Sequence, residues 1–245
     1  MKRYYVLASI KPTADCLAHY AKKGWLDNTA DGDHRLAWEL MAGNPDRRRN
    51  FVFRVSSRSP FSVEMMTPQP PSGQFPNWEI EAREVELEPA VGTVLDISSM
   101  AVLLKSSRPG KLDGRGKKHD LVSSHLHDLR SGKAIPEFDK LTKDSTRGEI
   151  ADKVTRMWVA RASARLGFKL VLDWKGEPCI HAEESAGSRE AGYCAPNIPS
   201  LRAVDIHARV EVTDAVAFAC MLANGIGSAK AYGYGMVTAA RPSSY

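Results

Sequence analysis

The residues best suited to chemistry on a phosphate group lie between positions 224 and 235, near the end of the sequence. Here Lys230 is flanked by four of the chain's 18 glycines, which are Gly225, Gly227, Gly233 and Gly235. Glycine lets a backbone turn through positive φ and approach another group closely, so clustered glycines beside a lysine are typical of amides that bind a phosphate. A tight helix-to-strand connection would use the same glycines. The pattern leaves both interpretations open.

Two named nucleotide-binding motifs are excluded for this loop. The P-loop motif needs Ser or Thr after its lysine, whereas Ala231 follows Lys230. The dinucleotide fingerprint needs a strand, then glycines, then a helix. Here the helix-compatible residues 214–223, which Asp214 should cap, precede the loop, and the strand-like residues 236–239 follow it. The loop is therefore expected to join a helix to a strand.

His34 is a candidate for acid–base chemistry, because an imidazole can donate or accept a proton near neutral pH. We expect a short helix from His34 to about Ala42, capped by Asp31 or Asp33. Helical spacing places His34 at the edge of an apolar arc made of Leu36, Ala37, Leu40 and Met41. If His34 lies in the first turn, the helix dipole favours a neutral imidazole that acts as a base. The alternative is a partly buried structural histidine.

The elements that would position these residues follow an α+β pattern. The strand-like segments of the first half are residues 3–10, 51–55, 61–67, 78–87 and 93–104. With the intervening helices they predict a first domain of residues 1–105. Residues 106–146 read as a basic and irregular region. Residues 147–245 contain a helix followed by a strand, helix, strand order, which predicts a second domain that resembles the first.

The charge balance favours an acidic partner such as nucleic acid, since the formal net charge is +5 and the pI is about 9.0. Six basic residues lie between Lys105 and Lys118, including Lys117. This run is either a solvated linker or a nucleic-acid contact. Arg35 could be a phosphate clamp or a surface charge. The helix at residues 149–166 carries three arginines that could contact nucleic acid or form a solvated face, namely Arg156, Arg161 and Arg165.

The remaining composition predicts a cytoplasmic protein with no membrane association, metal or cofactor. No apolar run approaches the roughly 18 residues of a membrane span. Cys179 lies two residues before His181, but the four cysteines show no Cys-x-x-Cys spacing. Free thiols are therefore favoured over a zinc site.

Two blocks of the sequence together resemble a known family. The first covers residues 34–55, with His34 four positions before Trp38, an Asn-Pro-Asp turn at 44–46 and Phe-Val-Phe-Arg at 51–54. The second covers residues 225–238. Both blocks resemble the CasE family, the CRISPR RNA-processing endoribonucleases of type I-E systems, to which processing subunits of type IV systems are related.

The resemblance implies two tandem ferredoxin-like (RRM-like) domains that bind the repeat stem-loop of precursor CRISPR RNA. It further implies cleavage without metal at the 3′ base of the stem, by attack of a 2′-hydroxyl on the adjacent phosphate. His34 matches the family's catalytic histidine, and Arg35 matches a basic neighbour. The expected partners are precursor and mature crRNA and other effector-complex subunits. The RNA contacts that we expect are Gly225, Gly227, Ser228, Lys230, Gly233, Gly235, Arg156, Arg161, Arg165, Lys117 and Lys118.

Two positions depart from the family pattern. Asp31 stands where some members have a tyrosine, and Glu39 stands where they have a basic residue. Two functions are therefore kept: an endoribonuclease that stays bound to its product, and a feebly active subunit that binds the crRNA hairpin in an effector complex. A generic RRM-like RNA chaperone would leave the joint match of the two blocks unexplained.

Overall fold

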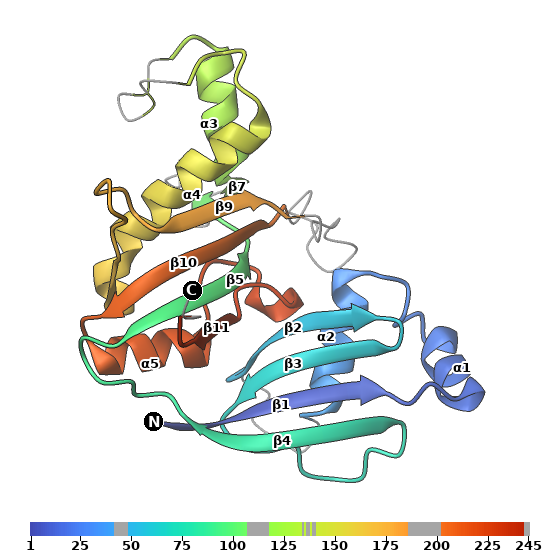
Figure 1. Ribbon diagram of the computed structural model, residues 1–245. Helices are drawn as coiled ribbons and strands as arrows, with labels where there is room; N and C mark the ends of the chain where they lie inside the picture. Colours follow the sequence, from blue (N-terminus) through green and yellow to red (C-terminus); the bar gives the residue numbers. More distant parts are fainter. Residues whose placement is uncertain are drawn as a thin grey trace, which may run out of the picture.

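The described part of the polypeptide forms two large antiparallel sheets, each covered by helices, and one small two-stranded sheet (Figure 1). The computed structural model describes residues 1–41, 49–106, 118–133, 135, 138, 141–185 and 202–242. Within these residues, the first sheet has the strand order β2-β3-β1-β4 and the second β11-β5-β10-β8, with β9 also paired to β10. Both orders are those of a ferredoxin-like domain, so the predicted pair of tandem ferredoxin-like domains is confirmed.

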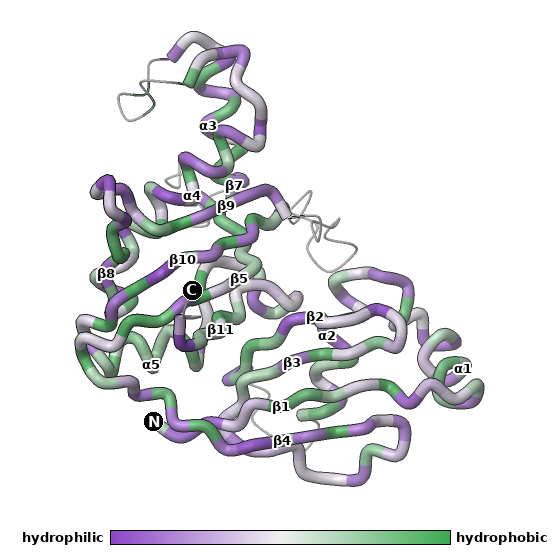
Figure 2. The backbone as a smooth tube through the Cα atoms, viewed as in Figure 1, coloured by the Kyte–Doolittle hydropathy of each residue, from purple (hydrophilic) through white to green (hydrophobic). Residues whose placement is uncertain are grey.

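The first domain contains two helices and four strands. Its elements are β1 (Lys2–Ile10), α1 (Ala14–Lys22), α2 (Ala30–Glu39), β2 (Val52–Arg58), β3 (Phe61–Thr67) and β4 (Trp78–Glu86). Alternate residues of β1 are buried because successive side chains of a strand point to opposite faces. These side chains pack against α1 and α2 around Tyr20 and Leu36. The edge strand β4 is hydrophilic along most of its length (Figure 2), which disfavours pairing with other chains.

The second domain contains the remaining elements and the larger core. Its elements are β5 (Val94–Ala101), β6 (Leu104–Ser106), β7 (Lys118–Asp120), α3 (Leu121–Arg130), α4 (Arg147–Ser163), the 3-10 turn η2 (Ala164–Leu166), β8 (Phe168–Leu170), β9 (Ile180–Glu184), β10 (Val204–Val212), α5 (Ala215–Asn224), the 3-10 turn η3 (Lys230–Tyr232) and β11 (Val237–Ala240). Asp214 caps α5 as predicted, because its Oδ1 accepts from the Ala217 amide at 2.9 Å.

The boundary between the domains lies earlier than residue 105. Strand β5 pairs with β10 and β11, so that Ala101 lies opposite Val204, and it belongs entirely to the second sheet. The sequence correctly indicated a strand here. It could not indicate the partner strand, which comes much later in the chain. The change of sheet therefore falls between β4 and β5.

The basic run that was assigned to an irregular linker region connects two paired strands. Lys105 of β6 lies opposite His119 of β7, so the two ends of the run are neighbours. Helix α3 then packs on α4, and both extend away from the first domain (Figure 1). Lys117 lies outside the described residues, and only the backbone of Lys118 is described.

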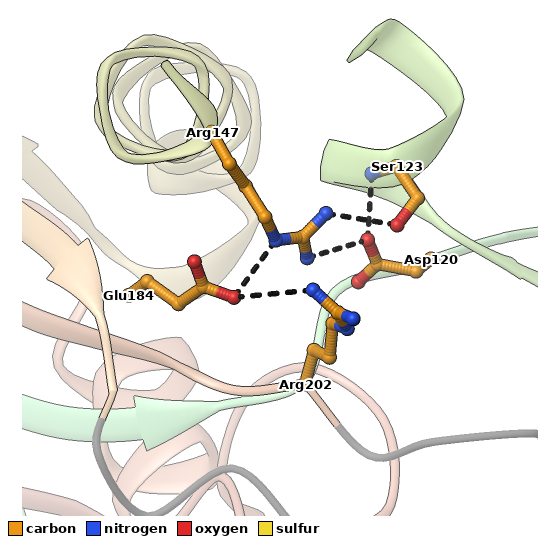
Figure 3. Close-up of polar contacts among 5 residues, drawn as sticks. All are labelled: Asp120, Ser123, Arg147, Glu184 and Arg202. Atoms are coloured by element: carbon orange, nitrogen blue, oxygen red, sulfur yellow. Dashed lines mark hydrogen bonds and ion pairs between the residues drawn. The ribbon is translucent and has the colours of Figure 1, made fainter. Parts of the chain in front are cut away.

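A partly buried ion network fastens this helical extension to the second sheet (Figure 3). The Arg147 guanidinium donates to Glu184 at 2.8 Å, to Ser123 at 2.9 Å and to Asp120 at 3.0 Å. Asp120 also caps α3 by accepting from the Ser123 amide. One arginine thus joins the starts of α3 and α4 to β9, and its bonds to two carboxylates belong to the stronger class of hydrogen bonds.

Candidate functional site at the junction of the two domains

Helix α2, which carries His34, begins four residues earlier than the sequence suggested. Thr29 is the N-cap, and its side chain accepts from the Gly32 amide at 3.0 Å. The cap is therefore neither Asp31 nor Asp33. His34 is the fifth residue of the helix and lies beyond the first turn, so the expected place in the first turn is wrong.

The imidazole of His34 is held by the glycine loop. Its Nδ1 lies 2.8 Å from the carbonyl oxygen of Ala231, 197 residues further along the chain. Because a carbonyl can only accept, Nδ1 must donate a proton, and the neutral ring then keeps its lone pair on Nε2. The ring also packs near Trp38 and Tyr232, with centroid separations of 6.1 and 5.9 Å. His34 is thus fixed in position and in tautomer.

A small core between the domains keeps α2 and the glycine loop together. Ala30 at the start of α2 is fully buried with Val102, Ala203 and Tyr234 of the second domain. Ser228 donates its amide to the Val102 carbonyl at 2.8 Å, so the loop is attached to the end of β5. Packing between the two domains therefore stabilises the contact between His34 and Ala231.

The glycines of the loop are required by close backbone crossings. Gly235 has φ of 78°, and a Cβ there would lie 2.0 Å from the Ile226 carbonyl oxygen. A Cβ on Gly225 would lie 2.3 Å from the Gly235 carbonyl oxygen. No side chain fits at such distances. Of the two interpretations that the sequence left open, the structure supports the tight connection for these two glycines.

Several amides of the loop already have partners inside the protein. Those of Gly225, Ile226, Ser228, Tyr232 and Gly235 donate to backbone carbonyls. The expectation that the loop amides bind a phosphate is therefore not met for Gly225, Ser228 and Gly235 in this structure, because each of these amide protons is used in holding the loop's shape. The loop contributes to the site through the Ala231 carbonyl and the side chain of Lys230.

Lys230 is half-buried over the glycines. Its Nζ donates to the Gly227 carbonyl at 3.2 Å, and its stem packs against Gly225 and Gly235. Burial, and then the charges of Arg49 and Arg165, lower the pKa of Lys230 below its ordinary value. The structure thus brings Arg165 of the predicted arginine set close to the loop. It also adds Arg49, which the sequence analysis did not select.

Arg35 is engaged with a carboxylate in this structure. Its Nε donates to Asp31 at 2.8 Å in an exposed pair one helical turn apart. Glu39, at the other position that departs from the family pattern, accepts from the indole nitrogen of Trp78 at 3.4 Å. Glu39 thus faces the core side of α2, whereas Arg35 is exposed.

The arginines of α4 and η2 occupy different surroundings. Arg156 pairs with Asp152 at 2.7 Å and lines a groove together with His181 and His207. Arg161 is exposed on α4, and Arg165 is exposed on η2. The structure therefore groups only one of the three with the glycine loop.

A buried ion pair below His34 was missed in the sequence. Asp33 has no exposed surface, and both of its oxygens accept from Arg58, at 2.7 and 2.8 Å. This bidentate pair ties α2 to the end of β2. Asp33 resembled a helix cap in sequence, and only its burial distinguishes it from one.

Three further observations concern the surroundings of the site and the rest of the described residues. A cleft of about 720 Å³ lies between the sheets, lined by Tyr5, Arg54, Arg83, Leu222 and residues of β11, and His34 does not line it. Among the described residues, no group of three or more His, Cys, Asp and Glu side chains is arranged to hold a metal ion. No helix in those residues is long and apolar enough to cross a membrane.

Comparison with known proteins identifies the family. The pattern of the CRISPR-associated protein family matches residues 16–241, and the chain belongs to this family. This confirms the resemblance to CasE proteins that the two sequence blocks indicated. A search of curated protein sequences gives no match.

Solved structures share the fold at low sequence identity. A CRISPR endoribonuclease Cse3 bound to a 19-nucleotide RNA is 16% identical, with a TM-score of 0.65 over 98% of this chain and 100% of that one. Thermus thermophilus Cse3 with an RNA that represents a pre-cleavage complex gives the same values. Cas6e from Escherichia coli K-12 is 17% identical, with a TM-score of 0.59 over 98% of this chain and 100% of that one.

Proposed function

We propose that this protein is a metal-independent endoribonuclease that cleaves precursor CRISPR RNA at the 3′ base of the repeat stem-loop and stays bound to the mature hairpin. Its family and the RNA-bound relatives with the same fold support this function. The observation that carries it is the bond from His34 Nδ1 to the Ala231 carbonyl, because it leaves Nε2 as the proton acceptor at the junction of two RRM-like domains. Such a substrate would place the protein in the cytoplasm.

In the proposed reaction, Nε2 of His34 takes the proton of a 2′-hydroxyl. That oxygen attacks the adjacent phosphorus, and the bond from phosphorus to the 5′-oxygen breaks. The leaving 5′-oxygen takes a proton from a general acid, which gives a 5′-hydroxyl end and a 2′,3′-cyclic phosphate. Positive charge from Lys230 would stabilise the doubly charged phosphorane-like transition state.

A cleavage assay in EDTA tests this function. The purified protein is incubated with repeat RNA in EDTA, and both ends of the products are mapped. We expect one cut at the 3′ base of the stem, with a 5′-hydroxyl on the downstream fragment. Dependence on added metal, or cuts spread along the RNA, would contradict the proposal.

A second function is kept because of one observation at the site. Arg35, which matches a basic neighbour of the family's histidine, is paired with Asp31, where some members have a tyrosine. This pairing offsets positive charge beside His34 and favours a subunit that binds the crRNA hairpin and cuts slowly. A CRISPR RNA-guided surveillance complex contains a chain with this fold, at a TM-score of 0.51 and 16% identity. Tight binding without product formation in the assay would favour this function.

Lys230→Met is expected to weaken RNA binding and to reduce the slope of log affinity against log salt by about one unit, because one phosphate contact is lost. Methionine keeps the apolar stem that packs on Gly225 and Gly235. The matched control is Lys169→Met, which removes an exposed lysine paired with Glu211. A slope for Lys230→Met equal to that of wild type would refute the phosphate contact.

A further inference from the structure

Arg49 carries a buried donor without an acceptor. Its Nη1 is shielded from solvent, and no atom in the described part of the chain hydrogen-bonds to it. Burial also lowers the pKa of Arg49 below its ordinary value. A buried polar group without a partner is costly, and more so when it belongs to a charged side chain. A ligand that accepts a hydrogen bond would remove this penalty.

The surroundings of Arg49 carry further positive charge. Lys230 lies close enough to Arg49 and to Arg165 for the positive charges of both arginines to lower its pKa. Within the described residues, none of the three forms an ion pair. By contrast, Arg54 and Arg58 on the adjoining strand β2 each bind a carboxylate. Three cations to which the described residues offer no counter-ion point to an anionic ligand.

The fold places this cluster beside His34. Arg49 lies three residues before β2, and β2 packs against η3. Phe53 of β2 lies against Gly233, where an added Cβ would be 3.1 Å from its ring. Lys230 immediately precedes Ala231, whose carbonyl holds the His34 ring. The cations and the histidine are therefore gathered around a single turn of 3-10 helix.

We propose that Arg49 and Lys230, with Arg165 at the rim, bind the phosphate group on which His34 acts, and that they retain it after cleavage as the terminal phosphate of the RNA. This inference rests on the proposed function. A planar guanidinium can donate two parallel hydrogen bonds to phosphate oxygens, whereas an ammonium supplies a point charge. The cyclic phosphate that forms first is still a diester, and its opening by water gives a 3′-phosphate monoester that carries more charge, so the site should prefer RNA with such an end.

The test compares two synthetic repeat hairpins that end at the 3′ base of the stem, one with a 3′-phosphate and one with a 3′-hydroxyl. Wild-type protein is expected to bind the phosphorylated hairpin about tenfold more tightly, the effect of one charge-assisted hydrogen bond. Arg49→Gln should abolish this preference and leave affinity for the hydroxyl-ended hairpin nearly unchanged. Arg83→Gln removes the same charge from the exposed strand β4 and should keep the preference.

A preference that persists in Arg49→Gln would overturn the assignment. No cleavage step occurs in this comparison, so its result is separate from success or failure of the endoribonuclease assay. The melting temperature in inorganic phosphate provides a reading that does not depend on RNA binding. Phosphate should raise the melting temperature of wild type and Arg83→Gln more than that of Arg49→Gln, and equal shifts in all three would also overturn the assignment.

Discussion

His34→Ala is expected to lower the single-turnover rate of RNA cleavage by about 10²- to 10⁴-fold, the usual contribution of a general acid or base. Affinity for repeat RNA should stay near that of wild type, because the proposed phosphate contacts come from other side chains. His34→Asn sharpens the test. Its side-chain amide can still donate to the Ala231 carbonyl but cannot accept a proton from the 2′-hydroxyl. Both variants should therefore be equally slow.

The control for this variant is His207→Ala, which removes an exposed histidine from β10. It should cleave at the wild-type rate. Recovery of wild-type activity in His34→Asn would show that His34 only anchors the loop. Wild-type cleavage by His34→Ala would remove the catalytic assignment altogether.

Arg58→Met is expected to lower the free energy of unfolding by about 3 kcal/mol, because it leaves the carboxylate of Asp33 buried without its partner. The Asp33 side chain has no exposed surface, so water cannot replace the two hydrogen bonds. Urea denaturation monitored by tryptophan fluorescence would measure the loss. Since Asp33 precedes His34 on the same helix, slower cleavage should accompany it.

The matched control for Arg58→Met is Arg156→Met, which removes one partner of an exposed pair within α4. Exposed pairs of this kind contribute about 0.3–0.5 kcal/mol. A similar loss in both variants would show that the bond between Asp33 and Arg58 contributes no more than a surface pair. Restoration by Asp33→Asn in the Arg58→Met background would instead identify the buried charge as the cause.

Local patterns predicted most elements because the relevant forces act over a few residues. The strand at residues 3–10 and the cap at Asp214 were predicted from local features, and the structure confirms them. Strand β5 belongs to the second sheet because it pairs with β10 and β11. Both partners come much later in the chain, so no local sequence pattern could predict this pairing. For the same reason the expected domain boundary came after β5 rather than before it.

The start of α2 shows a subtler limit. The expected caps were Asp31 and Asp33, whereas the observed cap Thr29 is a residue type that also caps helices but was not selected. Side-chain contacts exclude the two aspartates as caps, because Asp33 forms an ion pair with Arg58 and Asp31 forms one with Arg35. Burial, which separates these roles, is a property of the folded chain.

The candidate site was predictable in its parts but not in its assembly. The sequence selected His34 and Lys230 separately, and their catalytic and RNA-binding roles stay predictions. The contact from His34 to Ala231 brings them together, and sequence reasoning gave no sign of it. Arg49 is one of three consecutive arginines in the sequence, and it is distinguished by a buried nitrogen that has no hydrogen-bond partner among the described residues.

The most direct test of the central claim is cleavage of repeat RNA in which the nucleotide bearing the attacking 2′-hydroxyl is replaced by its deoxyribose form. The deoxy RNA should bind with wild-type affinity and show no cut in EDTA, while the unmodified RNA is cut once at the 3′ base of the stem. Cleavage of the deoxy RNA at the same position would contradict the proposed attack by the 2′-hydroxyl and the role of His34 as its base.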